Sequence, residues 1–122
     1  MRRHWIAAAM IIVQLPAIAL AQIGFGRIAK NGPFAEFRDG DWEMFRQTLR
    51  RSAEVSPEGE VVKWSNAATG AGGDVTVVKR YDLPDLGTCR DLNSRTIAKG
   101  RTGPFSVTLC RLPGGEWRIK AN

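Results

Sequence analysis

The side chains best suited to chemistry in this sequence lie in two Cys-Arg pairs. Arg90 follows Cys89, and Arg111 follows Cys110. Two guanidinium groups held close together can bind a carboxylate or a phosphate through paired N–H donors, so Arg90 and Arg111 are the candidate binding residues. Pairing with nearby aspartates, or plain solvation, is the alternative role for both.

Residue types that carry out catalysis or bind metals are scarce. His4 is the only histidine and lies at the extreme N-terminus. The rest of the chain therefore lacks the means for Ser-His-Asp or Cys-His catalysis and for a histidine-ligated metal. Glu54, Glu58 and Glu60 cluster in one turn region, but the sequence indicates no pocket around them for acid–base chemistry. We predict no catalytic residue, no metal and no cofactor.

The first residues form a pattern typical of a secretory signal. Two arginines near the start are followed by an uncharged apolar run over 6–21 that ends in the small-residue pattern Ala-Leu-Ala. At about 1.5 Å per residue, this run is too short for a hydrocarbon core of about 30 Å. The sequence predicts a signal peptide over 1–21, cleaved between Ala21 and Gln22. An uncleaved membrane anchor is the alternative.

Cleavage would deliver the remaining domain to the periplasm, either free there or associated with the outer membrane. The processed chain is expected to have no stable transmembrane segment. The chain carries 18 Lys and Arg against 12 Asp and Glu, a net charge of +6, and loss of Arg2 and Arg3 lowers this to +4. An exported basic domain suits an envelope protein, an anionic lipid or lipopolysaccharide as partner. Export argues against nucleic acid, and ordinary solubility is the alternative reason for the charge.

The two cysteines, Cys89 and Cys110, are the only ones in the chain. An even number of cysteines in an exported protein predicts a disulfide; two free thiols or half of a metal site are the alternatives. Lys99-Gly100 can form a two-residue hairpin turn, and counting outward from that turn places the cysteines opposite each other. The same register makes the two arginines that follow them diagonal neighbours on the other face.

One helix is expected before the strands. Asp41 is a plausible N-cap, and Ser56-Pro57-Glu58-Gly59 has the turn chemistry that ends a helix. Between them, apolar residues recur at intervals of three and four and form one buried stripe. The stripe consists of Trp42, Phe45, Leu49 and Ala53.

From residue 60 onward, alternating apolar and polar residues separated by glycine and proline turns predict strands. In the second strand, Val75, Val77 and Tyr81 are expected to share one face. The predicted fold class is α+β: one N-terminal helix packed on a four- to five-stranded antiparallel β-meander with one disulfide. We assign 22–38 to a flexible or loosely docked leader and 39–122 to the folded domain. Packing of Phe25, Phe34 and Phe37 on that domain is the alternative for the leader.

Several motifs then occur together in a recognisable order. They are Trp64-Ser-Asn66-Ala-Ala-Thr69-Gly70-Ala-Gly-Gly73-Asp-Val75, the two Cys-Arg pairs, and Gly114-Gly115-Glu-Trp117. This pattern resembles the C-terminal domain of the rickettsial 17-kilodalton outer-membrane surface antigen family. The chain differs from that family's usual pattern because no lipobox cysteine ends the signal and no glycine zipper fits between Gln22 and Arg38.

The resemblance implies a non-enzymatic surface-antigen-like domain of the bacterial cell envelope, periplasmic or associated with the outer membrane, that binds or scaffolds another envelope component. A small periplasmic enzyme or enzyme inhibitor that uses carboxylate or arginine chemistry is the alternative function. A pocket holding two carboxylates would favour the enzyme, whereas a shallow patch ringed by arginines would favour binding.

Overall fold

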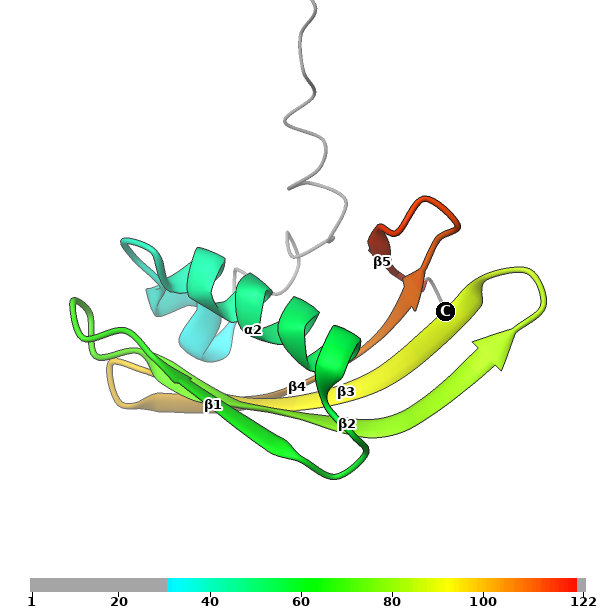
Figure 1. Cartoon of the computed structure of the whole chain (residues 1–122). Coiled ribbons are helices and arrows are strands. Elements are labelled where there is room, and N and C mark those ends of the chain that lie inside the picture. Colours follow the sequence, from blue (N-terminus) through cyan, green and yellow to red (C-terminus); the bar gives the residue numbers. More distant parts are fainter. Residues whose placement is uncertain (1–30, 121–122) are drawn as a thin grey trace, which may run out of the picture.

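The computed structural model describes residues 31–120, so the predicted signal peptide, the predicted cleavage site at Ala21 and Gln22, and the predicted leader up to residue 30 lie outside the described residues. The elements of the described part follow one another along the chain in a simple order (Figure 1). They are η2 (Gly32–Glu36), α2 (Asp41–Val55), β1 (Val61–Ser65), β2 (Gly72–Leu83), β3 (Gly87–Ala98), β4 (Arg101–Arg111) and β5 (Trp117–Ile119).

The five strands form one antiparallel sheet in the order β1-β2-β3-β4-β5. The sheet is strongly curved, and α2 lies across its concave side (Figure 1). The predicted α+β class, with one α-helix ahead of an antiparallel meander, is therefore confirmed. Among the residues that the structure describes, no helix has the length and apolar character needed to cross a membrane.

Helix α2 buries the apolar stripe expected from the sequence, since Phe45, Leu49 and Ala53 are all buried. The expectation that Asp41 caps the helix is wrong. Gly40 occupies the N-cap position with a φ of 82°, and Asp41 is the first helical residue. Its carboxylate does not bind the helix's own first turn because other segments of the chain bind it.

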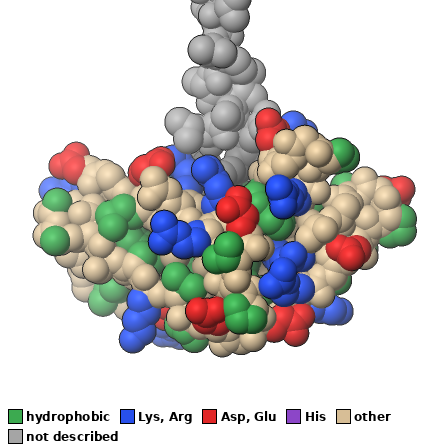
Figure 2. All heavy atoms as spheres, viewed as in Figure 1, with side chains coloured by type: hydrophobic (Ala, Val, Ile, Leu, Met, Phe, Trp, Pro, Cys, Tyr) green, Lys and Arg blue, Asp and Glu red, His purple; other side chains and the backbone are tan. Residues whose placement is uncertain are grey.

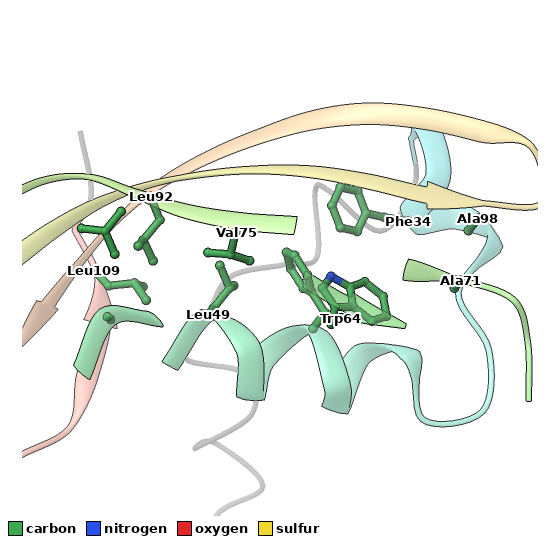
Figure 3. Packing of buried hydrophobic residues seen from close by; sticks show 11 residues of the cluster. Phe34, Leu49, Trp64, Ala71, Val75, Leu92, Ala98 and Leu109 are labelled. Carbon is green, nitrogen blue, oxygen red and sulfur yellow. The ribbon is translucent and has the colours of Figure 1, made fainter. Parts of the chain in front are cut away.

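The sheet has two unequal faces, which β3 shows most clearly. Its residues from Leu92 to Ala98 alternate between buried and exposed side chains. We call the face covered by α2 the inner face and the opposite one the outer face. Leu49 of α2 packs on the inner face against Val75 and Leu92 (Figure 3). This packing fixes which side chains of each strand turn toward the helix.

The last residues of the predicted leader are folded, and Phe34 packs on the domain as the alternative interpretation of this segment expected. Gly32–Glu36 forms a short 3-10 helix, and the Phe34 ring is only 4% exposed. Phe34 stacks on Trp42 and meets Phe105 edge to face, with ring centroids 5.6 and 5.8 Å apart. The folded domain therefore begins before residue 39, because aromatic packing holds this segment against α2 and β4.

The predicted turn and register of the β3–β4 hairpin are confirmed. Lys99 and Gly100 both have positive φ, 48° and 73°, as the favoured two-residue hairpin turn requires. Cys89 pairs directly with Cys110 and forms the predicted disulfide, with the two Cα atoms 4.0 Å apart. The bridge therefore joins neighbouring strands on the outer face.

The expected face sharing along β2 is wrong beyond Val77. A β-bulge between Val77 and Lys79 shifts the register, so that Arg80 pairs with Arg90 and Tyr81 with Cys89. A bulge adds one residue to one strand and reverses the alternation that follows. Tyr81 consequently lies on the outer face.

Candidate functional site

The two candidate arginines lie on the inner face, opposite the disulfide, as the register predicted. Arg90 pairs with Leu109 and Arg111 pairs with Thr88, which makes the arginines diagonal neighbours. Their surroundings nevertheless differ. Arg90 is 8% exposed, whereas Arg111 is exposed at the rim of the sheet.

Arg90 uses its guanidinium to hold the end of α2. Its Nε donates to the Ala53 carbonyl oxygen at 3.2 Å, and its Nη1 donates to the Cys89 carbonyl oxygen at 2.8 Å. The guanidinium carbon also lies 5.8 Å from the centre of the Trp117 ring, within range of a cation–π interaction. The sequence predicted that the N–H groups of Arg90 bind a ligand, but Nε and Nη1 donate to these backbone carbonyl groups instead.

Arg80, on the neighbouring strand, contacts the same end of the helix. Its Nη1 donates to the Ser56 carbonyl oxygen at 3.1 Å. The last turn of α2 contains no basic residue of its own, so β2 and β3 supply the positive charge that a helix C-terminus favours. Burial, followed by the nearby charge of Arg80, lowers the pKa of Arg90 from its usual value, while Asp82 opposes this shift.

Arg111 has a different neighbourhood. It pairs with Trp117 across β4 and β5, and among the described residues its guanidinium has no hydrogen-bond or ion-pair partner. The Trp117 indole is half-buried, and its Nε1 is buried without a partner in that part of the chain. We call this pair of residues the Arg111 shelf. The guanidinium N–H groups of Arg111 can donate hydrogen bonds to an anionic group that approaches the rim.

The part of the surface seen in Figure 2 does not form a single positive field, because basic side chains are scattered over it and interspersed with acidic ones. Glu54, Glu58 and Glu60 are all exposed. Glu58 is used structurally, since its Oε1 accepts from the backbone N–H of Arg80 at 2.8 Å. Within residues 31–120, no three His, Cys, Asp or Glu side chains are grouped to hold a metal ion.

Comparison with protein families supplies a description for this fold. A family model described as 17 kDa outer membrane surface antigen matches residues 52–118, more than half of the chain. The chain belongs to this surface antigen family. No curated protein and no solved structure matches it. The family match associates the domain with the outer membrane and confirms the resemblance found in the sequence.

The surface antigen motif around Asn66 has a structural role that the sequence alone did not reveal. Asn66 Nδ2 donates to Asp41 Oδ1 at 2.7 Å, and Thr69 Oγ1 donates to the same oxygen at 2.6 Å. The backbone N–H of Arg38 donates to the other carboxylate oxygen at 2.8 Å. The β1–β2 turn is thereby joined to the start of α2.

These hydrogen bonds determine how Asp41 ionises. Asp41 is fully buried, and burial alone would raise the pKa of its carboxyl group. The donors from Arg38, Thr69 and Asn66 together outweigh burial and lower that pKa below its usual value. Asp41 precedes the matched residues 52–118, so the sequence motif offered no direct signal for this partner.

Proposed function

We propose that this surface antigen domain is a non-enzymatic binding module of the cell envelope and that it binds an anionic group of another envelope component at the Arg111 shelf. The observation that carries the proposal is the exposed guanidinium of Arg111, which has no acceptor among the described residues and lies beside a half-buried tryptophan. Arginine favours such sites because its planar donors fit carboxylates and phosphates.

The location belongs to the same proposal. The N-terminal signal pattern supports export with cleavage between Ala21 and Gln22, and the family description supports association with the outer membrane. In that compartment, the available anionic groups are those of envelope proteins, anionic lipids and lipopolysaccharide. The mature charge of +4 (from +6 by loss of Arg2 and Arg3) favours all three.

The division of roles between the two arginines sharpens the proposal. Arg90 is a positioning residue because its guanidinium group donates to the end of α2 and lies over the Trp117 ring. Arg111 is the residue expected to touch the ligand. Replacing Arg90 should therefore lower the stability of the domain, whereas replacing Arg111 should weaken ligand binding and leave stability nearly unchanged.

Photocrosslinking in intact cells tests the proposal. A photoreactive residue at Gly114, where a side chain would meet open space, should give a discrete crosslinked product beside the shelf. Arg111→Ala should reduce that product about tenfold, because a charge-assisted hydrogen bond contributes about 1.5–3 kcal/mol. The melting temperature should change little. Phosphate-bearing vesicles of phosphatidylglycerol then identify a lipid ligand by cosedimentation.

The matched control is Lys63→Ala, which removes one exposed positive charge from β1 at the opposite edge of the sheet. It should leave both crosslinking and vesicle binding unchanged. A crosslinked product that persists undiminished in Arg111→Ala would show that the shelf is not the binding site.

A further inference from the structure

The outer face of the sheet carries two adjoining hollows. One has a volume of about 380 Å³ and the other about 270 Å³, and both are bordered by Asn93 and Ser106. Because the two hollows adjoin at these residues, we treat them together as one depression across β2 to β5 and call it the outer-face groove. Its polar lining residues include Asp74, Asp91, Asn93, Arg95, Ser106 and Lys120.

Hydrogen bonds hold the middle of this groove in a fixed arrangement. Asp91 Oδ1 accepts from the Tyr81 hydroxyl at 2.9 Å and from Thr108 Oγ1 at 2.7 Å. The other carboxylate oxygen of Asp91 has no protein donor in the described chain. Two residues along β3, Asn93 Oδ1 accepts from Ser106 Oγ at 2.9 Å, which leaves the Asn93 amide N–H groups available.

The groove thus presents a fixed acceptor next to a fixed donor on one strand. A sugar hydroxyl donates one hydrogen bond and accepts others, so neighbouring hydroxyls of a sugar fit this pairing. The charges of the lining residues balance, with Asp74 and Asp91 against Arg95 and Lys120. This balance gives no net attraction to a polyanion or a polycation. A lipid chain would leave the hydrogen-bonding groups at the middle of the groove without partners.

We propose that the outer-face groove binds an uncharged oligosaccharide chain. The two adjoining hollows offer room for more than one sugar unit, and their combined volume lies within the usual size of a ligand site. This inference goes beyond the proposed function, because the groove lies on the face opposite the Arg111 shelf and uses none of its residues. The two sites can therefore succeed or fail independently.

Nuclear magnetic resonance of the full-length chain tests the proposal directly. Maltotetraose, cellotetraose and chitotetraose are titrated separately against the isotopically labelled protein. The proposal expects at least one of them to shift the backbone amide signals of 91–95 and 104–108 in a saturable manner. Asn93→Ala removes the free donor and should weaken that binding about tenfold, as the loss of one hydrogen bond to the ligand predicts.

Two control variants show whether the binding is specific to the groove. Lys63→Ala changes an exposed β1 residue that does not border the groove, and Arg111→Ala changes the opposite face; neither should alter sugar binding. Because Asn93 is exposed, its replacement should leave the melting temperature nearly unchanged, so lost binding reports the site. Absence of saturable shifts with all three sugars overturns the proposal, as does binding that Asn93→Ala leaves intact or that Arg111→Ala removes.

Discussion

At the scale of single residues, Asp41 connects three separate segments of the chain. Its carboxylate receives hydrogen bonds from the backbone of Arg38 just before the helix, from Asn66 directly after β1 and from Thr69 in the same turn. A buried carboxylate is costly unless donors surround it. With these donors in place, the group fixes the start of α2 against the β1–β2 turn.

Asp41→Asn should lower the free energy of unfolding by about 2 kcal/mol at neutral pH, because the amide leaves buried donors without an ionised acceptor. The effect should depend on pH. The folded-state pKa is lowered, so the stabilisation is present above the unfolded-state pKa of about 3.9 and is lost as pH falls through the folded-state value.

Urea unfolding of both proteins between pH 7 and pH 2 measures this dependence. The difference between the native chain and Asp41→Asn should be constant above about pH 5 and should narrow below about pH 4. Asp39→Asn, at an exposed position two residues earlier, serves as the control and should change stability little. A difference that stays constant down to pH 2 would mean that the Asp41 charge does not stabilise the fold.

The two candidate arginines show why the site was only partly predictable. Spacing from the cysteines placed Arg90 and Arg111 correctly on one face, because strand alternation and the hairpin register depend on local sequence. The spacing of residues in the sequence could not show that the end of α2 covers Arg90 and leaves Arg111 exposed. That difference depends on the tertiary position of the Ala53 carbonyl, which no local pattern encodes.

At the scale of elements, the same limit applies to β2. Local turn chemistry predicted the β3–β4 hairpin, but the bulge after Val77 depends on distant backbone contacts. Gly59 donates to the Val77 carbonyl oxygen at 2.8 Å, and Glu58 accepts from the Arg80 N–H. The loop after α2 thus supplies hydrogen-bond partners to the part of β2 that β1 does not pair with. Alternation in the sequence carries no mark of this change.

Gly73 illustrates a constraint that one element imposes on another. It pairs with Trp64 on β1 and Thr96 on β3, and a Cβ atom there would collide with the Arg95 carbonyl oxygen. Gly73→Ala should therefore destabilise the domain by about 2–3 kcal/mol, since the backbone of a central strand pair must shift.

Thermal unfolding monitored by circular dichroism compares this variant with Gly114→Ala. Gly114 has open space around it and no positive φ, so its replacement should change stability by less than about 0.5 kcal/mol. Equal melting temperatures for the two variants would show that β2 and β3 can separate at Gly73 without cost.

At the scale of the whole molecule, the fold is a curved sheet with one face covered by α2 and η2 (Figure 1). The matched family region begins at residue 52, within the last turn of α2, yet Phe34, Phe45 and Leu49 belong to the core. The complete core therefore needs residues on both sides of that boundary. Sequence periodicity predicted the α2 contribution. The phenylalanines before α2 indicated only that this segment could pack on the domain, because no periodicity there shows which surface they contact.

The disulfide links this fold to the compartment in which it forms. Cys89 and Cys110 lie 21 residues apart, and in the chain-entropy model a bridge that closes such a loop stabilises the domain by about 3 kcal/mol. Export to an oxidising compartment favours this bridge.

Protein recovered from the cell envelope should therefore begin at Gln22 and gain the mass of two hydrogens on reduction. The reduced protein should then melt about 10 °C or more lower than the oxidised protein. Mass spectrometry with and without reductant, followed by calorimetry, measures all three. A chain that retains Met1 and has two free thiols would place the protein in a reducing compartment and remove the basis for envelope binding.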